Sequence, residues 1–412
     1  MKKIIVLALY LQFQITYAQS WPSVDWSSAT NLTNSLGASV VTDFSGLHWN
    51  PVNNRLYGVQ DNGVVRVLQF DINTNSFSQI ANRSISGGPE GITQANLYAN
   101  EFYTIDETKY EIRRYTHSSN FSNLSLYKHW DLLASPSPMT DTGNTGPEGI
   151  VFIPDAILSS IGFISEQTGQ VYTSVKGLGG LFFIANQNAG IIWVYDINPN
   201  SNDDFLYVGR YRTNRSESCD LSLDRSTGLL YILHNVSGNN KLEVTDLSTT
   251  IVNGNERKFV VKNEYFVTTP EDTNDNIEGF AITSKCSDAD NVSAWLCRDV
   301  KSSESTAIQQ DVLRWFQPFS AEGSCAPLSN TEFSKGTIQI HPNPADNFIT
   351  ISSDKEVVSA IRICNSLGQE VIKMENKSSV STSIDVSKLQ SGIYFLEVKH
   401  GERSTKTKFL KN

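Results

Sequence analysis

A four-strand unit recurs along this chain, and the repeat constrains the fold more than any other feature of the sequence. The first copy begins at Asp43 and reads DFSGLHWNPVNNRLYGVQDNGVVRVLQFDINTNSFSQI. Its order is a Gly-containing strand, a Pro/Asn turn, an aromatic strand, an Asp-Asn turn and two further strands. Four strands in about forty residues are the size of one blade of a β-propeller.

The same order of strands and turns returns along the chain, with loop insertions of different length. Alignment of the copies makes one position of each first strand equivalent: Gly46, Gly91, Gly149, Asp220 and Gly279. Five copies are visible. A sixth could be assembled from both chain ends, with VDWSSATNLTNSLGASVVT as its closing strand. We therefore expect an all-β chain with a β-propeller of five or six blades. A β-sandwich is the alternative, but it does not explain the recurring unit.

The two ends of the chain differ from the repeats. The opening MKKIIVLALYLQFQITYAQS has two lysines, a short apolar run and small residues before a cleavage point. This pattern predicts a signal peptide at residues 1–18. We expect the propeller at 19–326, a linker at 327–336 and a small β-rich module at 337–412. No later segment has the roughly 18 apolar residues that span a bilayer, so we expect an exported protein without a transmembrane segment.

Charge narrows the range of partners. The formal net charge is −10, from 33 Lys and Arg against 43 Asp and Glu. Binding to phosphate backbones requires a basic surface, so nucleic acid is not an expected partner. An acidic balance suits solubility and divalent cations. We expect a monomer.

Five cysteines accompany the predicted export, which permits disulfides. Cys286 and Cys297 enclose SDADNVSAWL, a spacing that suits a bond across a hairpin. Cys219 and Cys325 could form a second pair, and Cys364 stands alone in the C-terminal module. A zinc site is not expected, because no CxxC or nearby His pair is present.

A glutamate precedes the glycine in three of the copies. Glu90, Glu148 and Glu278 share this position, and Asp220 aligns near it. The first strands of all blades surround the propeller axis, so these carboxylates should converge. They would repel one another unless a cation, protons or hydrogen bonds offset the charge, and oxygen ligands suit Ca²⁺. The alternative is that each Glu accepts backbone N–H bonds and only locks neighbouring blades together.

A second polar set lies where the second strands end. Loops on one face of a propeller form the usual binding surface, so this set could line a pocket. The alternative is that Asp and Asn are simply favourable turn residues. The set comprises Asp61, Asn62, Asp106, Glu107, residues 186–188, His234, Asn235, Arg298 and Asp299.

The C-terminal module carries four recognisable segments. They are HPNPADN from His341, NSLGQEV from Asn365, SGIYFLEV from Ser391 and the basic ending KFLKN. Together they resemble the C-terminal sorting domain of the type IX secretion system of Bacteroidota. The resemblance implies a Greek-key β-sandwich that engages the type IX machinery and is removed on export. It also implies that the protein is secreted or held on the outer-membrane surface.

The propeller region carries a looser resemblance. SGLHWNPVNNRLYGVQDN, GPEGI and NIEGFAI look like the SdiA-regulated and phytase-like (esterase-like) group of secreted bacterial propellers, and more distantly the calcium-dependent gluconolactonase group. In the latter, a Glu before Gly and Asn residues from other blades hold the divalent metal. The resemblance implies Glu90, Glu148, Glu278 and Asn186 as metal ligands. The full ligand set of that group is not found, nor is the basic cluster that a phytase needs.

Two functions remain open from sequence. One is a secreted propeller that holds calcium and binds an extracellular glycan or protein. The other is a metal-dependent hydrolase of phosphoesters or of lactones and esters, with Asp106, Glu107 or Asp220 as general base. No GxSxG, HExxH or Walker segment supplies another chemistry. An open metal coordination position would favour hydrolysis, and a closed one would favour binding.

Overall fold

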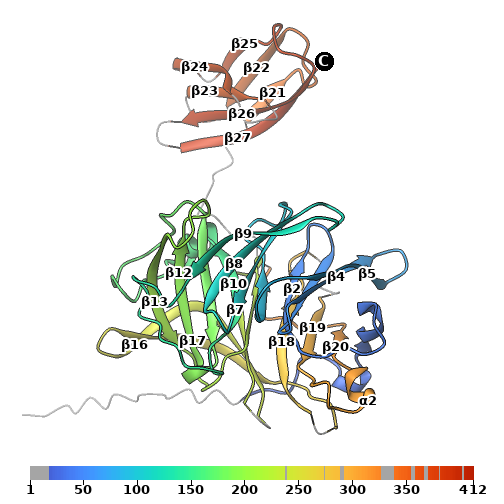
Figure 1. Cartoon of the computed structure of the whole chain (residues 1–412). Helices are drawn as coiled ribbons and strands as arrows, with labels where there is room; N and C mark the ends of the chain where they lie inside the picture. Colours follow the sequence, from blue (N-terminus) through green and yellow to red (C-terminus); the bar gives the residue numbers. More distant parts are fainter. Residues whose placement is uncertain are drawn as a thin grey trace, which may run out of the picture. The chain divides into compact units, whose positions relative to one another are not determined.

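The computed structural model describes residues 18–236, 239–272, 274–287, 292–325, 338–353, 358–365, 370–379, 381–400 and 403–412. The predicted signal peptide, apart from Ala18, and the predicted linker lie outside these residues. The chain divides into two compact units, Met1–Cys325 and Ala326–Asn412, and each is described on its own. Both are built from strands (Figure 1).

The first unit contains the predicted four-stranded blades, in which neighbouring strands pair antiparallel in chain order. Short Asn- and Gly-rich turns connect the strands, as in hairpins. The first blade has β2 (Phe44–Asn50), β3 (Arg55–Gln60), β4 (Val64–Asp71) and β5 (Ser76–Ser84). The second has β6 (Pro89–Thr93), β7 (Glu101–Asp106), β8 (Glu111–His117) and β9 (Leu124–Asp131).

The third and fourth blades form one eight-stranded sheet. Their outermost strands join through a short parallel pairing in which Tyr211 lies opposite Arg257. Their innermost strands also contact each other, so this sheet nearly closes on itself. The strands are β10 (Pro147–Pro154), β11 (Gly180–Asn186), β12 (Ile191–Ile197) and β13 (Phe205–Arg212), then β14 (Asp220–Asp224), β15 (Leu229–His234), β16 (Lys241–Asn253) and β17 (Glu256–Phe266). Helix α1 (Asp155–Ile161) lies in the insertion between β10 and β11.

The N-terminal segment completes the last blade. This blade contains β18 (Ile277–Ile282), β19 (Ala294–Arg298) and β20 (Leu313–Phe316), with helix α2 (Thr306–Gln309) before β20. Strand β1 (Thr30–Asn31) pairs with β20, where Thr30 lies opposite Trp315. The closing strand predicted from VDWSSATNLTNSLGASVVT therefore belongs to the fifth blade, and the described residues form five blades.

The five innermost strands close a ring around the propeller axis. Strand β2 contacts β6 on one side and β18 on the other, and β10 and β14 complete the circle. A separate hydrophobic cluster fills each of the five spaces between neighbouring blades. Inner strands such as β7, β11 and β15 are buried along their whole length because a neighbouring blade covers each face. This burial explains their continuous apolar runs.

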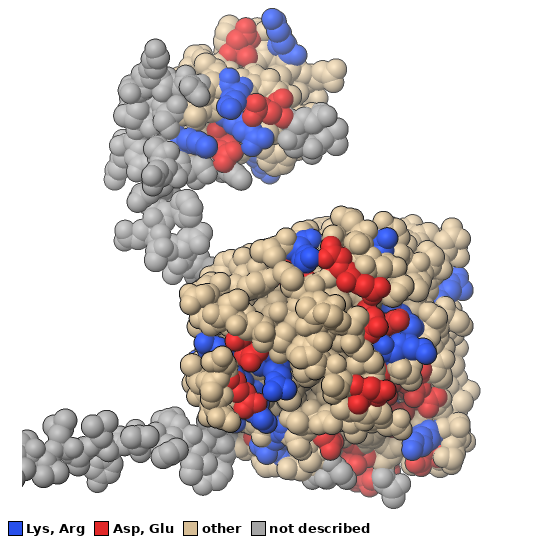
Figure 2. Space-filling model, turned by 60° about the vertical axis from the view of Figure 1, so that its left-hand side comes forward, with Lys and Arg blue, Asp and Glu red and all other residues tan. Residues whose placement is uncertain are grey.

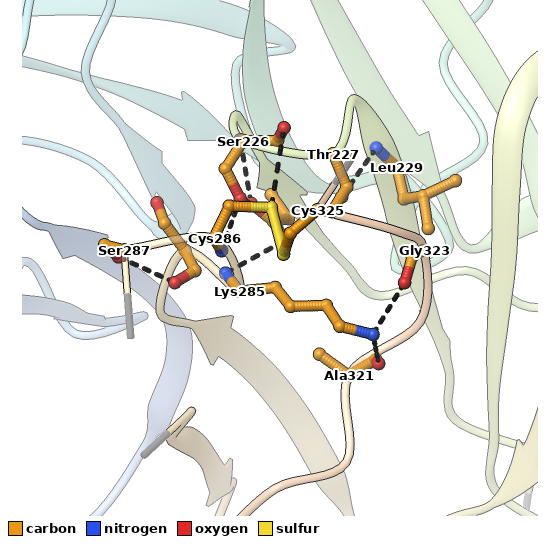
Figure 3. Close-up of a disulfide and its surroundings, with 11 residues drawn as sticks. Ser226, Thr227, Leu229, Lys285, Cys286, Ser287, Ala321, Gly323 and Cys325 are labelled. Carbon is orange, nitrogen blue, oxygen red and sulfur yellow. Dashed lines mark hydrogen bonds between the residues drawn. A yellow bond between two sulfur atoms is a disulfide. The ribbon is translucent and has the colours of Figure 1, made fainter. Parts of the chain in front are cut away.

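The predicted Cys286–Cys297 disulfide is wrong. Cys286 bonds instead to Cys325, with 5.2 Å between their Cα atoms (Figure 3). Cys297 lies on β19 and Cys219 lies just before β14, and both thiols are buried and free, so the suggested Cys219–Cys325 pair is also wrong. The observed disulfide ties the segment that follows the last blade to the loop after β18.

The second unit has two sheets that share one hydrophobic core. Strands that are neighbours in a sheet, such as β22 and β25 or β23 and β26, are not consecutive in the chain. Such long connections between neighbouring antiparallel strands are typical of the predicted Greek key. The strands are β21 (Ile338–His341), β22 (Phe348–Ser353), β23 (Val358–Cys364), β24 (Glu370–Ser379), β25 (Ser381–Asp385), β26 (Gly392–His400) and β27 (Arg403–Lys411).

Candidate functional site

The repeated glutamate occupies a β-bulge at the start of three innermost strands. Pro89 lies opposite Asp106 and Gly91 opposite Ile105, so Glu90 is the extra residue. The same shift in register leaves Glu148 and Glu278 unpaired on β10 and β18. A bulge re-aims the side chain of its extra residue out of the regular alternation. We call Glu90, Glu148 and Glu278 the axial glutamates.

The glycine after the glutamate is required by the neighbouring blade. A Cβ atom on the equivalent glycine of the first blade, Gly46, which follows Ser45, would lie 2.3 Å from the Glu90 carbonyl oxygen. A Cβ on Gly91 would lie 2.7 Å from the Ile150 nitrogen. These distances show that the innermost strands pack backbone against backbone around the ring. The Glu-Gly pair therefore combines two roles, close packing by Gly and a carboxylate by Glu.

Asp220 replaces this glycine in the fourth blade and bonds across the ring. One carboxylate oxygen, Oδ2, accepts the backbone N–H of Leu47 at 3.3 Å and of Phe280 at 2.9 Å. The other accepts the N–H of Leu221 at 2.8 Å. Asp220 is fully buried, and burial raises its pKa well above the usual range of a carboxyl. The oxygens of Asp220 bond to the backbone of three blades, so this side chain links the blades to one another. The role of Asp220 as a base stays a prediction.

The axial glutamates lie close enough to repel one another. Burial raises the pKa of Glu90 to about 8, and the negative charges of Asp61, Glu107 and Asp299 add to the rise. Burial also raises the pKa of Glu148 and of Glu278 well above the usual range. Glu90 and Glu278 are the carboxylates that act most strongly on Glu148. The structure therefore brings together three carboxylates that the sequence places in three separate repeats.

Hydrogen-bond donors are distributed unevenly over the three carboxylates. Ser45 bonds to Glu90, and Asn276 Nδ2 donates to Glu278 at 2.8 Å. Within the described part of the chain, no donor bonds to the Glu148 side chain, and the charges that act on it most strongly are all negative. The exposed fraction of Glu148 is intermediate, so its side chain keeps some contact with solvent. A carboxyl in such surroundings favours a proton or a cation.

Asn276 is a residue of this site that the sequence reasoning did not single out. Its Nδ2 bonds both to Glu278 and, at 3.2 Å, to Asp299, while its Oδ1 accepts from Asn235. It therefore links loops of the fourth and fifth blades around one axial glutamate. The signal was present in DNIEGF, where an Asn stands two residues before the Glu, while the two other copies that contain the Glu have Gly there.

The second polar set divides into engaged and available side chains. Asp106 pairs with Arg113 at 2.5 Å and accepts from Thr108 and the Lys109 N–H, so its oxygens are engaged. Glu107 is half-buried, and within the described ranges its side chain accepts a single hydrogen bond, from the Gly146 N–H at 3.3 Å. Burial raises the pKa of Glu107. Of the two, Glu107 is the side chain free to act at the axial glutamates.

His234 and Asn186 occupy buried positions in the neighbouring blades. His234 lies 3.3 Å from Glu243 through Nε2, and its Nδ1 lies 2.7 Å from the Glu217 carbonyl. These contacts match a hydrogen-bonded structural histidine. Asn186 ends β11 opposite Pro147, which places it beside the Glu148 bulge. Its role as a metal ligand stays a prediction.

The oxygen donors of this site suit calcium chemically, but they are not arranged as a preformed cage around an ion. The donors are carboxylate and amide oxygens, which Ca²⁺ prefers. One oxygen of Asp299, Oδ1, is buried and has no hydrogen-bond donor among the residues that the structure describes. However, in the described ranges no three His, Cys, Asp or Glu residues stand close enough together to hold a metal ion. Calcium binding would therefore require the glutamates to move toward one another.

Comparison with known families identifies the C-terminal unit. Residues 339–412 match the family model described as "Secretion system C-terminal sorting domain". The chain ends in a type IX sorting domain. The resemblance noted from HPNPADN, NSLGQEV and SGIYFLEV is thus confirmed, and the protein is directed by type IX secretion to the cell surface or the extracellular space of a Bacteroidota bacterium. None of the helices in the described part of the chain reaches the length and hydropathy of a membrane-spanning helix.

Comparisons of the rest of the chain are less informative. No match is found among curated protein sequences. Two solved structures that are similar are hydrazine synthase of Kuenenia stuttgartiensis and a nidogen/laminin complex, each with a TM-score of 0.33. The first is 12% identical, covering 77% of this chain and 66% of that chain. The second is 14% identical, covering 68% of this chain and 87% of that chain. The resemblance to the SdiA-regulated and phytase-like group stays a prediction.

Proposed function

We propose that this protein is a secreted binding protein whose propeller holds calcium at the axial glutamates and engages an extracellular glycan or protein. The observation that carries the proposal is the crowding of the Glu148 carboxyl by other carboxylates. Its carboxyl lies among Glu90, Glu278 and Glu107, and no described donor offsets the charge. A divalent cation would remove that repulsion and supply the missing partner for the carboxylate oxygens.

The residues that would hold the ion are the axial glutamates, with Asn186 beside Glu148. Bound calcium would fix the loops that start the innermost strands, because Asn276 links Glu278 to Asp299 on the neighbouring loop. Those loops lie on one face of the propeller, where ligands usually bind. On the face of this unit shown in Figure 2, acidic and basic side chains are mixed and no broad basic area appears. This surface favours a neutral or mixed-charge partner over nucleic acid.

The experiment is a calcium titration of the full chain after treatment with a chelator. We expect heat of binding by calorimetry and a rise in Tm, because a ligand that binds only the folded state stabilises it by about 2.7 kcal/mol at 100 times its Kd. The double variant Glu148→Gln, Glu278→Gln should lose at least tenfold in calcium affinity. Unchanged affinity in this variant, or no binding to the native chain, would refute the calcium site.

A matched control is Glu271→Gln. Glu271 is exposed and is not among the charges that shift the pKa values of the axial glutamates. The control removes the same charge and should bind calcium as the native chain does. A loss of affinity in the control would mean that net charge, and not the axial glutamates, governs binding.

A metal-dependent hydrolase is the second candidate, and one observation favours it. The carboxyl of Asp61 reaches solvent near Glu90, but the surrounding protein partly desolvates it, and together with the negative charges of Asp43 and Asp299 this raises its pKa to about 6. A carboxylate with that pKa can accept a proton near neutral pH. Assays of the calcium-loaded chain with phosphomonoester, lactone and ester substrates separate the two functions. Turnover that disappears in Asp61→Asn supports hydrolysis, and absence of turnover supports binding alone.

A further inference from the structure

A cavity of about 450 Å³ lies between the first and fifth blades. Trp49 and Pro51 line it from the end of β2, and Thr283 and Ser284 line it from the segment after β18. The axial glutamates stand at the beginning of the innermost strands, so this cavity lies at the opposite end of β2 and β18. We call it the aromatic cavity. Its volume is within the range of small-molecule binding sites.

Aromatic rings form the floor and one wall of the aromatic cavity. Trp49 stacks on Trp295 with 4.8 Å between the ring centroids. Phe77 meets Trp295 and Trp315 edge-on, at 6.0 and 5.3 Å. Trp295, Trp315 and Phe77 are 1%, 6% and 7% exposed, so packing fixes the floor. Trp49 and Phe70 are half-buried, so part of each ring remains accessible.

Neutral polar groups surround these rings. Asn54, Asn75 and Gln317 are exposed lining residues, and no hydrogen bond within the described ranges engages their side-chain amides. Asn54 and Asn75 adopt left-handed backbone conformations, with φ of 54° and 49°, in the turns that precede β3 and β5. Among the residues that the structure describes, none that lines the cavity is charged. The site is therefore suited to a ligand that is itself uncharged.

The accessible donors and acceptors of the cavity are the side-chain amides at its rim. The indole N–H groups of Trp295 and Trp315 are enclosed and have no acceptor within the described part of the chain, so they are out of reach of an occupant. A purely apolar occupant would cover the rim amides without replacing their hydrogen bonds to water. An occupant with several oxygen atoms can bond to the amides of Asn54, Asn75 and Gln317.

A covalent bond holds the segment 283–287, which forms one side of the aromatic cavity. Ser284 and Ser287 line the cavity, and Cys286, which lies between them in the chain, forms the disulfide with Cys325 (Figure 3). Lys285 Nζ donates to the carbonyls of Ala321 and Gly323, both at 2.6 Å. These bonds hold the wall in place before a ligand arrives, which lowers the entropic cost of binding.

We infer that the aromatic cavity binds a neutral saccharide. The faces of aromatic rings carry partial negative charge and attract the partly positive C–H groups on a sugar face. Sugar hydroxyls donate to and accept from amide side chains such as those of Asn54, Asn75 and Gln317. Phosphorylated or acidic ligands would find no cation among the lining residues. The inference rests on the proposed function in taking the protein as an extracellular binding protein, but it uses a different end of the propeller.

The test is binding of the purified full chain to neutral hexasaccharides of β-glucan, α-glucan, mannan and xylan, measured by calorimetry and tryptophan fluorescence. We expect at least one to bind and to change the fluorescence, because Trp49, Trp295 and Trp315 line the cavity. Trp49→Ala and Phe70→Ala should each weaken binding at least tenfold. Asn75→Gly, which keeps the turn conformation, should weaken it severalfold. Absence of binding to every hexasaccharide would overturn the inference.

The control variant is Tyr98→Ala. Tyr98 is 84% exposed, lies in the loop between β6 and β7, and does not line the cavity. It should bind as the native chain does, and each variant should keep the native Tm within a few degrees. Native affinity in folded Phe70→Ala and Asn75→Gly would overturn the inference even if Trp49→Ala failed to fold.

Calcium separates this inference from the proposed function. The lining residues within the described ranges include no carboxylate, so we expect saccharide binding to be unchanged in chelator. Binding that disappears in chelator and returns with calcium would assign the saccharide to the axial glutamates. That result would overturn the aromatic cavity while leaving the proposed function in place.

Discussion

The two ends of the same innermost strands carry opposite chemistry. Strands β2 and β18 begin near the axial glutamates, where carboxylates crowd together and their pKa values rise. The same strands lead at their other ends to the aromatic cavity, where no described lining residue is charged. The first end is under electrostatic strain until a proton or cation binds, and the second is packed and neutral. One scaffold thus presents two sites that should respond to different ligands and conditions.

The largest expected effect is the loss of stability in Asp220→Ala, which changes the first residue of the innermost strand β14. This change leaves the N–H groups of Leu47, Leu221 and Phe280 without their acceptor in a buried position. Each unpaired buried group costs about 1–3 kcal/mol, so we expect a loss of at least about 3 kcal/mol in the free energy of unfolding. Urea denaturation measures this loss.

Asp220→Asn is the matched variant, because its side chain has the same shape and retains one acceptor oxygen. We expect it to lose less than half as much stability as Asp220→Ala. If the alanine variant were as stable as the native chain, Asp220 would not be the link between the first, fourth and fifth blades.

A smaller effect concerns pH and distinguishes the charged end from the neutral one. Glu90 has a folded-state pKa of about 8, above its ordinary value of 4.5. Below pH 4.5 it is protonated in both states, and between about 4.5 and 8 the unfolded state loses its proton more readily. Stability therefore falls as pH rises through this window, by up to about 1.4 kcal/mol per pH unit.

Glu90→Gln should weaken this dependence and raise Tm at pH 8 relative to the native chain. Thermal unfolding in chelator, measured from pH 5 to pH 8, checks it, with Glu271→Gln as the control that keeps the native slope. Parallel curves for the native chain and Glu90→Gln would show that the crowding of carboxylates has no energetic consequence. Saccharide binding in the aromatic cavity should vary little over the same pH range.

Part of this picture could be predicted from local pattern. The four-strand order, the equivalence of Gly46, Gly91, Gly149, Asp220 and Gly279, and the C-terminal sorting domain all follow from residues that lie near one another in the sequence. Equivalent positions in a ring must face the axis, so the approach of Glu90, Glu148 and Glu278 also followed from the repeat.

Other features depend on contacts between distant segments, which no local pattern records. Strand β1 completes the fifth blade because Thr30 meets Trp315, so the blade count could not be fixed from the repeats. Cys286 pairs with Cys325 because the segment after the last blade folds back onto the loop after β18. The aromatic cavity is assembled from Trp49, Phe77 and Trp295, each of which looks like an ordinary core residue in its own strand.

A crystal structure of the protein soaked in calcium tests the central claim most directly, because it examines both ends of the propeller in one measurement. The account predicts one ion bound by oxygens of Glu148 and Glu278 at about 2.3–2.6 Å, and none in the aromatic cavity. Axial glutamates that stay in the present arrangement without an ion, at a calcium concentration that saturates ordinary extracellular sites, would contradict it.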